Sequence, residues 1–157
     1  MATLNVTITE SVTLNGKDQG GTYSGFSNSS ITQVDKKLIN AKTGVELTLY
    51  KTADTIADGT ASNLWDDDSV KYVRITNLAA NSAYSFIRIR NANDDEVSYK
   101  LYGTESLLLY RHEATMDATA GAAITLGSGD NDVVLVTIKA ISSDQAVELF
   151  IAATDEA

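Results

Sequence analysis

The sequence predicts an all-β protein, a jelly-roll-like β-sandwich of about eight to ten short antiparallel strands. Apolar and polar residues alternate with a period of two along most of the chain, which is the pattern of half-buried strands. No window shows an apolar stripe of helical period bounded by capping residues. With 157 residues, of which 43% are hydrophobic, the chain can bury a core of its own, so we expect one sandwich domain over 1–157.

The first predicted strand covers 3–14, and its apolar residues stand at even positions: Leu4, Val6, Ile8, Val12 and Leu14. The odd positions carry mainly threonine, whose β-branched side chain favours an extended backbone. Glu10 interrupts the apolar side, and an unpaired buried carboxylate would cost several kcal/mol. We therefore expect the strand to split at Glu10–Ser11 and to continue in a different sheet.

The polar, glycine-rich stretch 15–30 is too long for a hairpin turn, so we expect a long loop or an arm there. Short strand segments follow at 31–34 and 37–40, and a longer one at 45–51. A second long loop, rich in turn-forming residues, covers 52–69.

Two hairpins are predicted in the second half, one from 70–78 and 83–90, and one from 133–141 and 146–153. Further strands are expected at 97–102 and 106–113, and the only helix that the pattern allows is a short one near 114–123. Residues 70–87 and 133–150 align without gaps. Either any two hairpins would share this pattern, or the sandwich contains two related halves.

Composition argues against several classes of function. The formal net charge of −9 has the wrong sign for binding nucleic acid or an anionic membrane. The chain has no cysteine, which excludes disulfides and thiolate metal sites. No apolar run reaches the ~18 residues needed to cross a membrane, and "MATLNVT" lacks the basic start of a secretory signal. We expect a protein made and assembled in the cytoplasm.

No catalytic, cofactor-binding or metal-ligating set is predicted. His112 is the only histidine and has no cysteine or second histidine to act with, so a triad or a zinc site is not expected. The acidic groups Asp66–Asp68, beside Trp65, and Asp130–Asp132 suit calcium by chemistry, but the first group lacks the spacing of a calcium-binding loop. A solvated acidic loop and ordinary turn residues are the alternatives.

Arginine and aromatic residues are interleaved in "YVRITN" and "YSFIRIR". If these strands pair as a hairpin, arginines lie among aromatic rings on one sheet face, which is the composition of a protein–protein contact. The predicted interface residues from this region and from the first strand are Leu4, Val6, Ile8, Tyr72, Arg74, Tyr84, Phe86, Arg88 and Arg90.

Three stretches, "MATLNVTITESVTLNG", "VKYVRITNLAANSAYSFIRIRN" and "AVELFIAA", resemble small virion structural proteins of tailed bacteriophages, especially those of marine and cyanobacterial hosts. The resemblance covers about a third of the chain and includes no catalytic signature. It implies an all-β protein without enzymatic activity or cofactor, which functions by packing against other virion subunits.

The first functional hypothesis is therefore a capsid decoration (cement) protein, located in the virion, that binds the major capsid protein through its N-terminal strand region and one sheet face. We expect a homo-oligomer, with a trimer preferred, and no nucleic-acid or membrane partner. A tail or neck component is the alternative within the same class. A carbohydrate-binding β-sandwich that uses Trp65 and the 66–68 acids is the alternative outside it, and an enzyme is the least expected.

Overall fold

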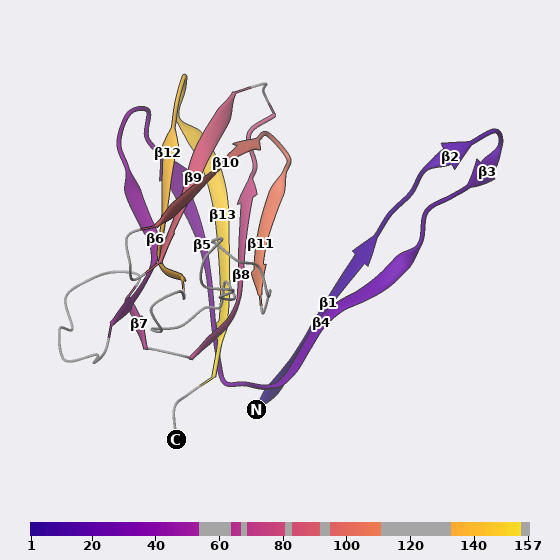
Figure 1. Cartoon of the computed structure of the whole chain (residues 1–157), viewed down its shortest axis with the longest axis horizontal. Coiled ribbons are helices and arrows are strands. Elements are labelled where there is room, and N and C mark those ends of the chain that lie inside the picture. The colour runs from indigo at the N-terminus through magenta and orange to yellow at the C-terminus, as the bar shows by residue number, and fades with distance from the viewer. Residues whose placement is uncertain (54–63, 67–68, 81–82, 92–94, 111–132, 155–157) are drawn as a thin grey trace.

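A computed structural model describes residues 1–53, 64–66, 69–80, 83–91, 95–110 and 133–154, and it shows a β-sandwich from which a long hairpin projects (Figure 1). The described residues contain no helix, and so no helix that could span a membrane. The expected helix near 114–123, together with His112 and Asp130–Asp132, lies outside the described residues.

Two sheets form the sandwich, as the sequence predicts. The first has the order β11-β8-β13-β5, with strands β5 (Gln33–Ala41), β8 (Val70–Asn77), β11 (Ser106–Tyr110) and β13 (Gln145–Ala153). The second has the order β10-β9-β12-β6-β7, with strands β6 (Leu47–Ala53), β7 (Leu64–Asp66), β9 (Tyr84–Asn91), β10 (Glu96–Tyr102) and β12 (Val133–Ala140). All pairs are antiparallel except β6 with β7.

The strand pairing is that of a jelly roll. The first sandwich strand, β5, pairs with the last, β13, and the second, β6, pairs with the last but one, β12. Further along the chain, β8 pairs with β11 and β9 pairs with β10, which completes the series of nested pairs. A long antiparallel ribbon folded over in this way gives two packed sheets with few free edges.

Between the sheets lies one apolar core, to which every sandwich strand contributes inward-facing residues. Ile75, Ile87, Ile138 and Leu149 are almost completely buried there, and burial of each such side chain stabilises the fold by ~1.5–3 kcal/mol. Trp65, on β7, is also buried in this core.

Both hairpins predicted in the second half are wrong, because each pair of strands is divided between the two sheets. β8 lies in the first sheet and β9 in the second, while β12 lies in the second and β13 in the first. The buried side chain of Asn77 stabilises the crossing from β8 to β9. Its nitrogen donates to the Leu101 carbonyl at 3.1 Å and to Oε1 of Gln145 at 3.4 Å. A short polar connection between two strands looks the same in the sequence whether it turns back or crosses over.

The internal sequence similarity corresponds to a two-fold pattern of pairing. The two strand–crossing–strand units pack together through β8 with β13 and β9 with β12. In the first strand of each unit the matched residues Val73 and Val136 are both buried. In the second strand, however, Ile87 faces the core, whereas its gapless match Phe150 does not. The two crossings therefore differ in length by one residue, which puts the second strands of the gapless alignment out of phase.

Residues 2–31 form the projecting hairpin, which we call the arm (Figure 1). It comprises β1 (Ala2–Thr9), β2 (Thr13–Leu14), β3 (Lys17–Asp18) and β4 (Thr22–Ile31). Asn15 and Gly16, with φ angles of 52° and 75°, form the two-residue turn at its tip, and the left-handed conformation at both positions is that of a type I′ turn.

The arm differs from the sequence expectations in two respects. The stretch 15–30, expected as a long loop or arm, contains the tip turn and most of the returning strand β4. The first strand does end before Glu10, as expected, but it continues within the same hairpin and enters neither sandwich sheet. Glu10 is exposed, so its carboxylate needs no buried partner.

Candidate interaction surfaces

The base of the arm packs on the outer face of sheet β11-β8-β13-β5, which we call the arm-side face. Phe26 of β4 is the centre of this contact, with its ring 6.4 Å from that of Tyr72 and 5.6 Å from that of Tyr110. Tyr72 also meets the ring of Phe150 edge-on at 6.0 Å. Tyr72 is only 4% exposed, and this burial raises the pKa of its hydroxyl.

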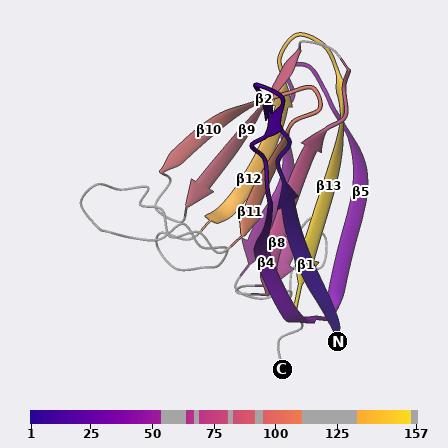
Figure 2. The same cartoon turned by 90° about the vertical axis from the view of Figure 1, so that its right-hand side faces the viewer.

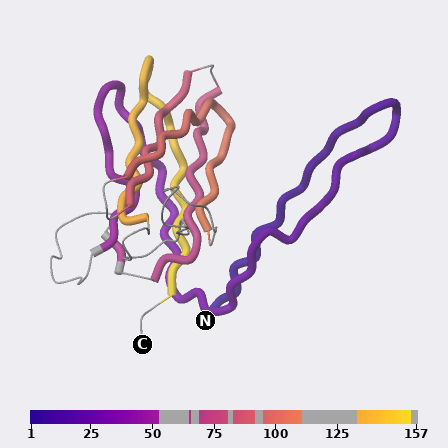
Figure 3. Tube along the Cα trace, viewed as in Figure 1, coloured from indigo at the N-terminus to yellow at the C-terminus, as the bar shows by residue number. Residues whose placement is uncertain are grey.

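Beyond this contact the arm leaves the sandwich and extends away from it (Figures 1 and 3). The remaining apolar side chains of the arm are in solvent: Ile8, Val12, Leu14 and Tyr23 are 36%, 57%, 61% and 57% exposed. Ile8 pairs with Tyr23, and the backbone hydrogen bonds from Glu10 to Gly21 and from Gln19 to Val12 keep the same register to the tip. Ile8, Val12 and Leu14 thus continue the stripe begun by Leu4 and Val6.

A charged cluster occupies the middle of the arm-side face. Arg74 of β8 donates to one carboxylate oxygen of Glu148 on β13, and Nζ of Lys36 on β5 lies 2.9 Å from the other. The guanidinium of Arg74 also stands 5.4 Å from the ring centre of Phe150. The hydrogen bond from Lys36 is the main cause that lowers the pKa of Glu148, and Arg74 adds to it.

At the free edge of this face β5 exposes two large apolar side chains, Val34 (55%) and Leu38 (75%). Lys36 stands between them on the same side of the strand, because side chains of a strand alternate between its two faces. Figure 2 shows the arm in front of β8, with β5 beside it. None of these three residues was predicted as an interface residue.

The outer face of the other sheet, which we call the basic face, carries most of the predicted arginine and aromatic residues. Tyr84 packs edge-on against Phe86 at 5.4 Å, and Nζ of Lys100 lies 5.0 Å from the Tyr84 ring centre. Arg88 is held by two carboxylates, with Nη1 3.2 Å from Glu46 and Nε 3.4 Å from Glu96.

A shallow pocket of about 350 Å³ opens on the basic face, lined by Glu46, Phe86, Arg88, Ser98, Thr137, Lys139 and Ile141. Glu46 bridges its rim, since it pairs with Arg88 and accepts a hydrogen bond from the Thr137 hydroxyl. Lys139 adds a second cation, so the pocket combines one aromatic ring with a net positive charge.

The structure therefore divides the predicted interface between two faces. Leu4, Val6, Tyr72 and Arg74 meet at the arm-side face, whereas Tyr84, Phe86, Arg88 and Arg90 lie on the basic face of the opposite sheet. The expectation of one continuous arginine–aromatic face is wrong, because it depended on β8 pairing with β9. Tyr72 is covered by the arm of its own chain, so it is not open to a partner.

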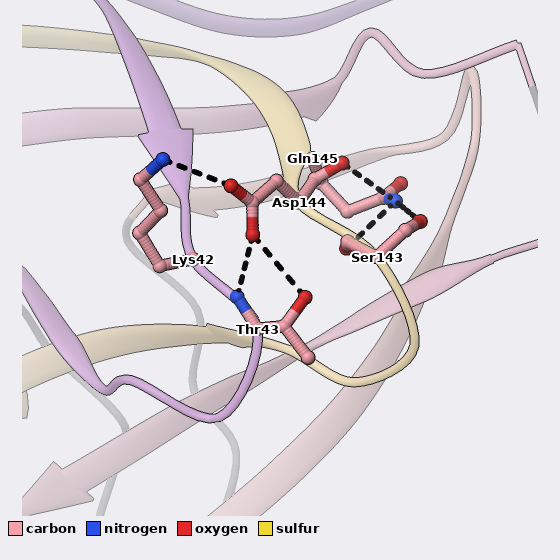
Figure 4. A network of polar contacts seen from close by, with 5 residues as sticks. All are labelled: Lys42, Thr43, Ser143, Asp144 and Gln145. Atoms are coloured by element: carbon pink, nitrogen blue, oxygen red, sulfur yellow. Dashed lines mark hydrogen bonds and ion pairs between the residues drawn. The ribbon is translucent and has the colours of Figure 1, made fainter.

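Other polar residues serve the fold. Asp144, between β12 and β13, accepts hydrogen bonds from Nζ of Lys42 and from the Thr43 amide, both at 2.9 Å (Figure 4). These bonds, that from Lys42 first, lower the pKa of Asp144. They fasten the connection between β5 and β6 to the β12–β13 crossing, where the Gln145 side chain in turn holds Ser143.

The structure bears in part on the predicted sugar-stacking role of Trp65 and on the acidic groups that suit calcium. Trp65 is 7% exposed, so its ring is part of the core and offers no surface on which a sugar could stack. The acidic residues 67–68 and 130–132 lie outside the described residues. Within the part of the chain that is described, no group of three or more acidic, histidine or cysteine side chains could hold a metal ion.

Comparison of the chain with family models, with curated proteins and with solved structures found no match in any of the three.

Proposed function

We propose that this chain is a non-enzymatic structural protein of a tailed-phage virion, and that it decorates the capsid by binding the major capsid protein. The observation that carries the proposal is the arm, a long hairpin that holds apolar side chains in solvent away from its own sandwich. A two-stranded hairpin is marginally stable in water, so a surface of this kind suits a protein that is surrounded by neighbouring subunits.

The phage assignment also depends on the resemblance of the opening, central and closing stretches to small virion proteins. Jelly-roll sandwiches are rigid and have few free edges, which suits a subunit that presents fixed surfaces to an assembly. The proposal places this protein in the virion, after assembly in the host cytoplasm.

We assign the contact with the capsid shell to the basic face. Arginine and aromatic side chains are enriched at protein–protein contacts, and this face combines Tyr84 and Phe86 with four cations, Arg88, Arg90, Lys100 and Lys139. Among the described residues, Glu46 and Glu96 pair with Arg88 on this face. The four cations named outnumber these two carboxylates, so the named side chains carry a net positive charge, whereas the chain as a whole has a net charge of −9. An acidic patch on the shell would complement it.

The test uses virions of the phage that encodes this chain. Decoration predicts a copy number comparable to that of the major capsid protein and density on the outer shell in electron cryo-microscopy. A small number of copies at the neck or tail would support the tail alternative instead and would reject decoration.

Heads that lack the protein, mixed with purified protein, test the assigned face. Phe86→Ser/Lys100→Ser should lose binding to these heads, while Val45→Ser/Leu78→Ser, which removes exposed apolar side chains elsewhere, should bind as wild type. Equal binding by both double variants would reject the basic face as the contact.

One observation favours a second candidate function, carbohydrate binding: the pocket on the basic face combines the Phe86 ring with hydroxyl and charged side chains. Its test is a glycan array in which Phe86→Ala abolishes binding. Trp65→Ala is not informative for this purpose, because that ring is buried and its removal would disturb the core.

A further inference from the structure

We propose that the arm of one copy packs on the arm-side face of a second copy of this chain, where its Ile8–Leu14 segment covers Val34 and Leu38. The inference concerns contacts between copies and does not depend on the proposed contact with the capsid shell. Four observations carry it: where exposed apolar side chains gather, an existing contact of the same kind, matching charges, and the direction of the arm.

Exposed apolar side chains gather on these two surfaces. Among the described residues eleven large hydrophobic side chains are exposed, and six of them belong either to the distal arm or to the outer side of β5. The six are Ile8, Val12, Leu14, Tyr23, Val34 and Leu38. No described part of the same chain covers either surface, and the apolar character of each suits it to cover the other.

The same two surfaces already meet within one chain. Leu4, Val6 and Phe26 at the base of the arm pack on Tyr72 and other apolar residues of the arm-side face. The apolar stripe of the arm continues past this contact to Leu14, and the face continues past it to β5. The proposed contact between copies therefore extends a packing that the structure shows, with the same elements on both sides.

On both surfaces a charged side chain stands between two apolar ones. Along the arm the stripe runs Ile8, Glu10, Val12, and along β5 the outward residues run Val34, Lys36, Leu38. Each surface thus has one charged side chain between two apolar ones, and the charges are opposite. Lys36 can turn to Glu10 without leaving Glu148 alone, because Glu148 keeps its bond to Arg74.

The direction of the arm indicates that the arm covering β5 comes from a second copy. The distal arm extends away from the sandwich, and β5 of the same chain lies beside the base of the arm (Figures 1 and 2). The packing of Phe26 on Tyr72 and Tyr110 fixes this direction. Since every copy carries one arm and one receiving face, two copies that exchange arms, or a closed ring of copies, satisfy all of them.

Sedimentation velocity over a series of concentrations tests the contact with the intact chain. Wild type should associate. The arm variant Ile8→Ser/Leu14→Ser and the face variant Val34→Ser/Leu38→Ser should each raise the dissociation constant more than ~10-fold. Val45→Ser/Leu78→Ser removes two exposed apolar side chains outside both surfaces and should associate as wild type.

Mixing the two variants separates loss of the contact from misfolding. The face variant has an intact arm, and the arm variant has an intact face, so a tagged form of one should bind the other although neither binds itself. Absence of this mixed complex, when circular dichroism shows both variants folded, would overturn the proposal.

Charge exchange identifies the register. Glu10→Lys should weaken association about 5-fold, and Glu10→Lys/Lys36→Glu should recover most of it. Thr9→Lys, which adds a cation on the opposite side of the arm, should have no such effect. A wild-type protein that stays monomeric at all concentrations overturns the inference, and if that monomer still decorates heads, the proposed function stands without it.

Discussion

Lys36 and Arg74 hold the two oxygens of the same carboxylate, that of Glu148, from the strands on either side of it. This arrangement ties β5 and β8 to β13 through side chains as well as through the backbone ladder. Glu148 is therefore kept ionised, and its pKa lies below its ordinary value of 4.5.

The first prediction concerns the pH dependence of stability. Because the folded-state pKa of Glu148 is lowered, its contribution is fully present above the ordinary carboxyl pKa and is lost as the pH falls through the lower folded value. Lys36→Met should raise the pKa of Glu148 toward 4.5, as followed by NMR titration of its side-chain carboxyl carbon. Lys17→Met, the same change at the arm tip, should leave this titration unchanged, and an equal shift in both variants would refute the assignment.

A second prediction concerns the attachment of the arm. Phe26→Ala removes the ring that packs on Tyr72 and Tyr110, and because Phe26 is half-buried we expect a loss of about 1–2 kcal/mol rather than that of a fully buried ring. Hydrogen exchange should accelerate in β1 and β4 and stay unchanged in β12. Tyr23→Ala, which removes an exposed ring from the same strand, is the control and should leave the exchange rates of the arm base as they are.

Two glycines of the arm provide a third prediction. A Cβ at Gly20 would lie 2.0 Å from the Glu10 carbonyl oxygen, so Gly20→Ala must push the two sides of the hairpin apart. A Cβ at Gly25 would meet nothing closer than 3.5 Å. We expect Gly20→Ala to abolish amide protection around Gly21 and Gln19, and Gly25→Ala to preserve it. Similar protection in the two variants would contradict the close approach.

The fourth prediction concerns the crossing between β8 and β9. Asn77 is completely buried, donates to Leu101 and Gln145, and accepts a hydrogen bond from the Ala79 amide. Asn77→Ala leaves these groups without partners and should lower the free energy of unfolding by about 2–3 kcal/mol, measured by urea denaturation. Asn40→Ala, at an exposed position of β5, should cost much less, and comparable losses would argue against the internal role of Asn77.

Strand positions followed from the sequence more closely than strand partners did. The predicted strand at 146–153 matches β13, and that at 97–102 matches β10, because alternation of apolar and polar residues is a local property. Which strands pair depends on contacts far apart in the chain, such as that of Asn77 with Gln145. Local patterns therefore predicted hairpins where the chain crosses between sheets.

The sequence of the arm carries a signal for its own hairpin. Asn15-Gly16 between alternating residues is a strong indicator of a two-residue hairpin turn, and it would have joined 3–14 to the strand that follows. The exposed residues Val34 and Leu38 had no such signal. Apolar residues of a short strand look alike in the sequence whether they face a core or solvent, and only the structure shows that Val34 and Leu38 lie on the outer side of β5.

The pairing of β13 with both β5 and β8 has a consequence for synthesis of the protein. β13 is the last sandwich strand to leave the ribosome, so the first sheet stays in two separate pieces until translation has passed Ala153. The arm, in contrast, ends at Ile31, so it is made before Tyr72, Tyr110 and Phe150 of the face on which its base packs. The apolar surface of the arm is therefore made before the residues on which it packs, and it stays exposed until Phe150 has been added. Long-range pairing dominates this interval, during which a nascent chain is most prone to aggregate.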